Sequence, residues 1–287
     1  MKIDDKVVFI EGENHGHYPY ANSLLIKDEV TALIDAGIGK SIEELAKKER
    51  VDLIIHTHSH EDHIAGDGFF RSEIAIHSLE APILEKVERL ADLYGSKGEE
   101  MISFIRGFIG YKGLRVDHKF EDGYIFHLGD IQLKAVHTPG HSMGHTCFFE
   151  NERKMLFSGD IDLSSFGPWY GALDSSIDDF TSSIKRVKAL RPKVVISSHK
   201  GVILDDIGDR FDVYLAKIYE REDKILGYLD SKRNLDSIVS QAFIYGKFPE
   251  VMRSWYVLME RIMVEKHLER LIWMGKVERT EDTFSAL

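Results

Sequence analysis

The feature that most constrains the fold is an apolar run, VDLII at residues 51–55, that leads directly into the polar segment HTHSHEDH at residues 56–63. A short apolar run with a sharp polar boundary is typical of a buried strand. Three further runs, at residues 131–136, 154–159 and 193–198, are also followed by ionisable side chains. In open sheets covered by helices, sites lie at the carboxyl ends of the strands. We therefore expect four chain segments to bring their side chains to one edge of a sheet.

The side chains at these positions are imidazoles and carboxylates, which bind divalent metal ions. Taken singly, a histidine near a strand end is usually an ordinary hydrogen-bonded residue. Packed together without a metal, these groups would suffer desolvation and, once protonated, mutual repulsion. Seven ligands are too many for one tetrahedral ion and suit two ions that share a bridging carboxylate. The seven candidates are His58, His60, Asp62, His63, His141, Asp160 and His199.

The segment HSHEDH, residues 58–63, resembles the HxHxDH signature of the metallo-β-lactamase superfamily. The segments LIDAG, HTPGHSMGH, FSGD and SSHKG occur in that family's order, and the resemblance spans residues 5–205. It implies an α/β fold, a four-layer αββα metallo-β-lactamase sandwich with a binuclear site at one edge of the β layers.

The resemblance also implies a role for each candidate. It places the first ion on His58, His60 and His141, the second on Asp62, His63 and His199, and both on Asp160 as the bridge. Asp35, in LIDAG, is expected to accept a hydrogen bond from a metal-binding imidazole, and His145 to support the ligands from outside. The implied cofactors are two divalent cations, with zinc favoured and iron or manganese as alternatives.

The implied chemistry is hydrolysis, in which a hydroxide bridging the two ions attacks the substrate. Asp62 and Asp160 are the expected catalytic residues because they would orient this hydroxide. Class B β-lactamases commonly carry Cys at the position of Asp160, and the iron redox branch generally carries Glu at that of His60. The glyoxalase II-like and β-lactamase-like endoribonuclease branches fit better. We expect hydrolysis of an ester or thioester of a small molecule. A single-strand endoribonuclease or phosphodiesterase is the alternative, and a non-enzymatic metal-binding or iron redox protein is disfavoured.

Two loops are candidate substrate contacts. The loop SSFGPWYG, residues 164–171, follows Asp160 and carries three aromatic residues, so it predicts either a rigid turn packed on the core or a pocket wall. The loop at residues 13–23 resembles the family's N-terminal loop that borders the site. The predicted contacts are His17, Tyr18, Phe166, Trp169 and Tyr170.

The chain is expected to divide into a metallo-β-lactamase domain, residues 1–208, and a C-terminal helical domain, residues 209–287. The second region is similar to the winged-helix-like domain of the endoribonuclease branch. Its periodicity predicts helices near residues 210–229, 235–245 and 250–274, followed by a tail that forms a hairpin or strand. Residues 205–287 carry 13 basic and 16 acidic side chains without a basic stripe, which favours packing over nucleic-acid binding.

Composition limits the remaining possibilities. The formal net charge of −11 disfavours a polyanion-binding protein, although a local basic groove is compatible with it. Cys147 is the only cysteine, so no intrachain disulfide is expected, and no apolar segment predicts export or membrane insertion. We therefore expect a cytoplasmic protein with a small-molecule substrate, and a homodimer is compatible with its apolar helices. Only 2 Gln and 4 Asn accompany 85 charged residues, which favours a heat-adapted source.

Overall fold

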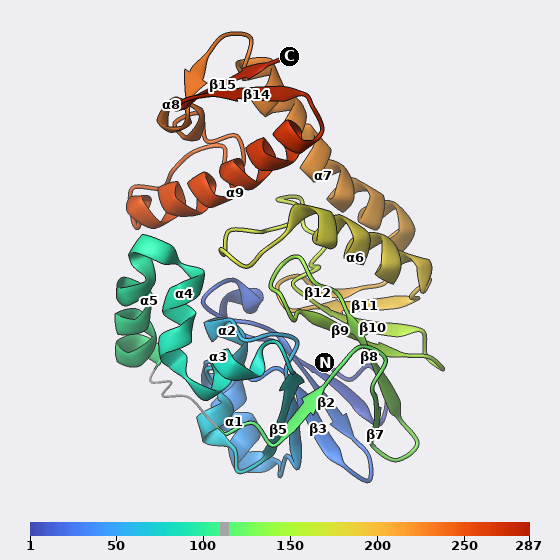
Figure 1. The fold of residues 1–287 in the computed structure, drawn as a ribbon. Coiled ribbons are helices and arrows are strands. Elements are labelled where there is room, and N and C mark those ends of the chain that lie inside the picture. Colours follow the sequence, from blue (N-terminus) through green and yellow to red (C-terminus); the bar gives the residue numbers. More distant parts are fainter. Residues whose placement is uncertain (110–114) are drawn as a thin grey trace.

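The computed structural model describes residues 1–109 and 115–287. Two six-stranded sheets form its centre, with strand orders β1-β2-β3-β4-β5-β6 and β12-β11-β10-β9-β8-β7 (Figure 1). The strands of the first sheet are β1 (Val7–Ile10), β2 (Ser23–Lys27), β3 (Thr31–Ile34), β4 (Leu53–Ile55), β5 (Glu73–His77) and β6 (His118–Phe120). Those of the second are β7 (Ile125–His127), β8 (Gln132–His137), β9 (Thr146–Glu150), β10 (Met155–Gly159), β11 (Val194–Ser197) and β12 (Gly201–Ile203).

The two sheets face each other because their apolar side chains alternate between faces. In β2, Leu24 and Ile26 belong to the buried cluster between the sheets, which also contains Phe148 and Phe157 of the second sheet. Leu25, between them, points to the opposite face. This period of two is the pattern of a strand with both faces covered. It requires a helical layer on each outer side.

Helices supply both outer layers. The outer face of the first sheet is covered by α1 (Lys40–Lys48), α2 (Glu61–Ile64), α3 (Ala81–Glu85), α4 (Leu90–Leu93) and α5 (Gly98–Phe104). The outer face of the second sheet is covered by α6 (Ile177–Ala189) and α7 (Ile207–Tyr228). The predicted four-layer αββα sandwich is therefore confirmed.

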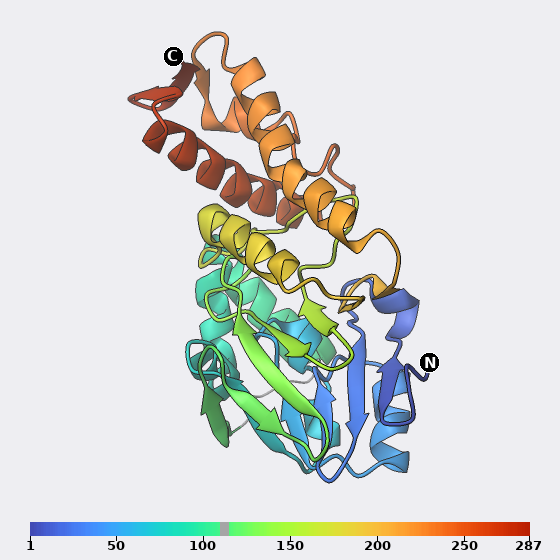
Figure 2. The ribbon, with the colours of Figure 1, turned by 90° about the vertical axis from the view of Figure 1, so that its right-hand side faces the viewer.

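The C-terminal region lies beyond α6 (Figures 1 and 2). It contains the end of α7, then β13 (Arg233–Asn234), α8 (Leu235–Val239), α9 (Arg253–Trp273), β14 (Val277–Thr280) and β15 (Thr283–Ala286). The terminal hairpin is present as the antiparallel pair β14–β15. The helix expected to reach residue 245 ends at Val239, and Ala242, with a φ of 52°, is incompatible with a helix that continues to residue 245.

The predicted boundary between residues 208 and 209 falls inside α7. Residues from both sides of it share one buried cluster, which includes Phe180 of α6, Tyr214 of α7 and Met263 of α9. The two-domain division and the winged-helix-like character of the second region stay predictions. In the described part of the chain, no helix combines the length and apolarity needed to cross a membrane.

Candidate metal centre

The seven predicted ligands meet at one edge of the sandwich. β4 ends at Ile55 between its parallel neighbours β3 and β5, so the histidine-rich segment emerges at that edge. β10 and β11 also run parallel and carry Asp160 and His199 just beyond their carboxyl ends. His141 reaches the same place from the loop between β8 and β9. The strand-end argument from the sequence therefore describes the observed convergence.

A first group of three imidazoles converges on one point. His58 Nε2 lies 3.0 Å from His60 Nδ1 and 3.2 Å from His141 Nε2, and His60 Nδ1 lies 2.9 Å from His141 Nε2. Nitrogens bound tetrahedrally to zinc at about 2.0–2.1 Å would be about 3.3–3.4 Å apart. Burial lowers the pKa of His60 and of His141 to about 3, and that of His58 well below its usual range. The three rings are therefore neutral and fit a single cation.

A second group lies beside the first, and Asp160 stands between them. Asp160 Oδ2 is 3.2 Å from His141 Nε2, and its Oδ1 is 3.1 Å from His63 Nε2 and 3.4 Å from His199 Nε2. Asp62 completes the group, with Oδ2 3.5 Å from His199 Nε2. His63 Nε2 and Asp160 Oδ1 are buried and have no well-formed hydrogen bond among the described residues. Buried polar atoms left in this way call for an additional partner, and a cation would supply it.

The charges in the second group also favour a bound cation. Burial alone would lower the pKa of His199, but the carboxylate of Asp160 raises it to about 9. The carboxylates thus draw a proton onto the imidazole when no other cation is present. A divalent ion that binds these atoms would displace that proton.

The outer nitrogens of four histidines are held by hydrogen bonds that leave Nε2 free to bind. His63 Nδ1 donates to Asp35 at 2.8 Å, and His58 Nδ1 lies 2.9 Å from Thr57 Oγ1. His141 Nδ1 donates to the Trp169 carbonyl at 3.0 Å, and His199 Nδ1 to the Gly16 carbonyl at 2.6 Å. Such contacts determine the tautomer and the orientation of metal-binding imidazoles.

Asp35 and His145 lie where their expected supporting roles require. Besides His63, Asp35 accepts hydrogen bonds from Thr57 N and Oγ1, each at 2.8 Å. Although burial opposes it, the His63 imidazole helps lower the pKa of Asp35 to about 2, so the carboxylate stays ionised. His145 Nε2 accepts from the Asp160 main-chain N–H at 3.1 Å. Each residue thus contacts one ligand from outside.

Three of the predicted substrate contacts lie near the cluster. The Trp169 ring centroid is 5.4 Å from that of His141 and 5.9 Å from that of His60. His17 lines a cavity of about 500 Å³ together with His199 and Lys200. The exposed Tyr18 donates its hydroxyl hydrogen to Glu61 Oε1 at 2.8 Å.

Tyr170 does not lie at the site, which corrects the expectation that it contacts substrate, whereas the same expectation for Phe166 stays a prediction. Tyr170 is 0% exposed, and its hydroxyl is 2.7 Å from His267 Nε2. Phe166 packs against Tyr245, with ring centroids 5.4 Å apart. Adjacent residues in an extended segment point to opposite sides, so Trp169 faces the histidines while Tyr170 faces the C-terminal helices.

Two buried glutamates were not identified from the sequence. Glu80 accepts hydrogen bonds from Ser59 Oγ, from Ser142 Oγ at 2.6 Å and from Gly144 N at 2.8 Å, and so ties the first histidine loop to the His141 loop. Glu61 accepts from Tyr18 and Tyr94, and burial raises its pKa to about 7. Glu80 belongs to no motif, and no pattern in the sequence indicates its partners.

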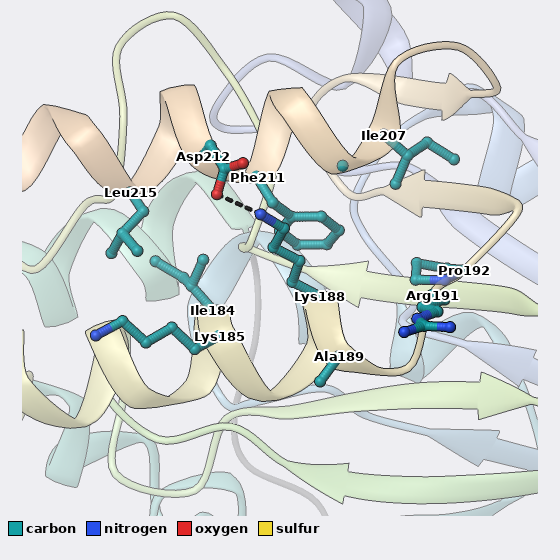
Figure 3. Close-up of a pocket in the computed structure, with 11 residues that line it drawn as sticks. Ile184, Lys185, Lys188, Ala189, Arg191, Pro192, Ile207, Phe211, Asp212 and Leu215 are labelled. Atoms are coloured by element: carbon teal, nitrogen blue, oxygen red, sulfur yellow. Dashed lines mark hydrogen bonds and ion pairs between the residues drawn. The ribbon is translucent and has the colours of Figure 1, made fainter.

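A separate cavity of about 540 Å³ lies between α6 and α7 (Figure 3). Ile184, Phe211 and Leu215 form its apolar wall, and the Lys188–Asp212 ion pair crosses its rim. None of the seven cluster residues lines it. It is therefore not the candidate active site.

Comparisons with known proteins agree with this geometry. The sequence model of the metallo-beta-lactamase superfamily matches residues 19–199. The beta-lactamase-like protein 2 homolog of Caenorhabditis elegans is 22% identical and covers 96% of this chain and 91% of its own. The acyl-coenzyme A thioesterase MBLAC2 of Gallus gallus is 32% identical, covering 59% of this chain and 67% of its own, and that of Homo sapiens is 29% identical, covering 64% and 73%.

Solved structures show the same fold over the full length. A metallo-beta-lactamase family protein from Thermus thermophilus superposes with a TM-score of 0.76 at 20% identity, covering 100% of both chains. A beta-lactamase domain protein from Burkholderia ambifaria gives 0.73 at 16% identity, covering 100% of this chain and 93% of that one. With a family match over more than half of the sequence and histidines that converge as a metal site requires, this chain belongs to the metallo-β-lactamase superfamily and is one of its metal-dependent hydrolases.

Proposed function

We propose that this protein hydrolyses a thioester of a small acyl substrate, using two divalent cations held at the edge of the sandwich. The observation that supports the two sites is the position of Asp160, with one carboxylate oxygen toward each group of imidazoles. The first ion would be held by His58, His60 and His141, the second by Asp62, His63 and His199, and both by Asp160.

Zinc suits this donor set best, because imidazole and carboxylate ligands in compact groups favour it, and iron or manganese fits less closely. Cations held in this way supply a nucleophile from water at neutral pH and polarise a carbonyl oxygen. That chemistry serves esters, thioesters and phosphodiesters alike, so the substrate class must come from other observations.

The chain's own residues would orient the reaction. Asp62 and Asp160 are the two carboxylates among the seven cluster residues. Their oxygens can accept hydrogen bonds from the attacking water, so they would orient it and take up its proton. Trp169 forms an apolar wall beside His60 and His141, where an acyl group would pack. The cavity lined by His17, His199 and Lys200 would admit an anionic end of the substrate.

The thioester assignment is supported by relatives. The chicken and human proteins named acyl-coenzyme A thioesterase share 29–32% identity with this chain. The worm relative matches both regions of this chain, but its name states only its β-lactamase-like character. The absence of a basic stripe in residues 205–287 disfavours the nuclease alternative.

Kinetics on purified, metal-replete protein test the proposal. We would measure bound metal by elemental analysis, and then kcat/KM on a series of acyl-coenzyme A thioesters, chromogenic esters and single-stranded RNA. We expect two ions per chain and the highest kcat/KM on a thioester. A higher kcat/KM on RNA than on every small substrate would establish the nuclease instead, and one ion or fewer would overturn the binuclear site.

A further inference from the structure

We propose that Arg221 of α7 is a positioning residue for His141, which it reaches through the main chain of residues 164–171. The inference rests on the proposed function, because it takes His141 as a ligand of the first metal ion. It assigns the C-terminal helices a part in holding the metal site, which the sequence did not indicate.

Arg221 donates most of its hydrogen bonds to the main chain of this loop. Nη1 donates to the Pro168 carbonyl at 2.6 Å, and Nη2 donates to the Phe166 carbonyl at 2.6 Å. Nη1 also donates to the Tyr170 hydroxyl at 2.8 Å. The guanidinium carbon lies 4.9 Å from the centroid of the Phe166 ring. One side chain thus holds the loop on both sides of Trp169.

The guanidinium of Arg221 is buried, so it would lose its hydrogen-bond acceptors, at a cost in free energy, if the loop at residues 164–171 moved away. Arg221 is 3% exposed, and no carboxylate among the described residues lies within ion-pair distance of its guanidinium. A buried cation that no carboxylate contacts directly is tolerated only when its donors are satisfied, and the planar fork of Arg suits several carbonyls at once. Arg221 therefore holds the loop and is itself stabilised by it.

Trp169 transmits this constraint to the metal site. Its carbonyl accepts the hydrogen bond from His141 Nδ1 at 3.0 Å, and its neighbours on both sides are bound by Arg221. Because this hydrogen bond selects the tautomer that leaves His141 Nε2 free, the position of the carbonyl determines how well His141 can bind a cation.

The loop approaches α7 closely, and α9 adds a second anchor. Gly167 has a φ of 88°, and a Cβ there would lie 2.4 Å from Lys217 Cβ. Lys266 of α9 donates to the Ser175 carbonyl at 2.6 Å, and Ser175 Oγ donates to the His141 carbonyl at 2.8 Å. The C-terminal helices thus hold His141 from its side chain and from its main chain.

The test compares Arg221→Met, which keeps the apolar stem and removes all donors, with Arg210→Met as the matched control. Arg210 lies on the same helix but is exposed and donates to the Asp205 carbonyl. Zinc affinity would be measured by competition with a chromogenic chelator, and first-site coordination by the visible absorption of the cobalt-substituted protein. Circular dichroism would establish folding.

We expect Arg221→Met to weaken one of the two zinc-binding steps by about 10- to 100-fold and to change the cobalt spectrum, as for other residues that orient a ligand. Arg210→Met should match the wild type in both measurements. A folded Arg221→Met protein with wild-type zinc affinity and cobalt spectrum would overturn the proposal.

If Arg221→Met does not fold, Arg221→Lys decides the question, because lysine keeps the charge but lacks the planar fork that donates to the Pro168 and Phe166 carbonyls together. We expect a smaller loss of zinc affinity and a shifted cobalt spectrum, and no change in either would overturn the proposal. These measurements need no substrate. If the wild type binds no metal, the proposed function fails, whereas equal binding by wild type and variants rejects only the role of Arg221.

Discussion

The metal cluster and the core of the C-terminal region both bury ionisable side chains, but they satisfy them in different ways. In the cluster, His58, His60 and His141 each bring one ring nitrogen to within 3.2 Å of the other two. In the C-terminal region, Glu260 is equally buried, and its two oxygens accept from Ile244 N and Tyr245 N at 3.1 Å each. Burial of charge therefore does not by itself identify a functional site.

The informative difference is what each buried group faces. Glu222 is paired with Arg270 and so has its counter-ion within the fold. Asp160 and His63 instead retain buried atoms without a well-formed hydrogen bond. Such atoms also occur elsewhere, at His267 Nδ1 for example, so an added cation is indicated where several ligand atoms converge, as they do around Asp160 and His63.

The largest expected effect is that of Asp160→Ala. Removing the carboxylate that faces both groups should lower kcat/KM by more than about 100-fold, a loss beyond that of residues that only orient ligands. Bound metal should fall as well, and elemental analysis with thioester kinetics measures both. Asp130→Ala is the control, because Asp130 is exposed and forms a surface ion pair with Lys6. Near-wild-type turnover in Asp160→Ala would show that the bridge is misassigned.

Leu271→Ala in the C-terminal region is expected to lower the stability of the fold and to leave metal binding unchanged, the reverse of Asp160→Ala. Leu271 is completely buried in the cluster that joins α9 to the terminal hairpin. Its truncation should lower the free energy of unfolding by about 2–5 kcal/mol, from lost burial and the cavity left behind. Urea unfolding measures this change, and zinc affinity should stay at the wild-type value. A specific loss of metal with unchanged stability would remove the distinction between the two regions.

A smaller effect on the cluster is expected from Asp35→Asn. In the wild type, Asp35 accepts hydrogen bonds from His63 Nδ1 and from Thr57 N and Oγ1. The NH₂ group of asparagine is itself a donor, so it would face one of these donors and that hydrogen bond would be lost. Metal affinity or activity should fall by about 10- to 100-fold. Asp117→Asn is the matched control, because Asp117 also accepts a main-chain N–H, from Ile74 at 3.1 Å. Equal losses in both variants would indicate general destabilisation and not a specific support of His63.

The smallest expected effect is the alkylation of Cys147 in the native protein, because its thiol is buried. Burial raises the pKa of its thiol to about 12. Because the folded pKa lies above the unfolded value of 9.0, the neutral thiol's stabilising contribution is complete below 9.0 and is lost as pH rises through about 12. We therefore expect no alkylation by iodoacetamide at about pH 8 in the native state and full alkylation after unfolding. Mass spectrometry measures both, and rapid native labelling would show that this strand opens.

Several interpretations of the sequence stay predictions, among them the cytoplasmic location, the homodimer and the heat-adapted source. Each depends on composition, which constrains a chain's surroundings only indirectly. The loop at residues 164–171 illustrates a different limit. Its aromatic content predicted substrate contacts, yet the Trp169 ring lies beside the metal-binding histidines while the adjacent Tyr170 points away from them to His267.

From the sequence, the resemblance to the metallo-β-lactamase superfamily indicated the αββα sandwich, and the ionisable side chains directly after four apolar runs indicated the residues that meet at its edge, because such runs are local properties of the chain. Apart from Asp35 and His145, which the resemblance indicated, the residues that support that edge were decided by the tertiary structure alone. Glu80 joins two loops more than 60 residues apart, and Arg221 reaches a carbonyl 53 positions away. Such contacts depend on where distant backbone groups come to lie once the layers have packed, and no local pattern records that position.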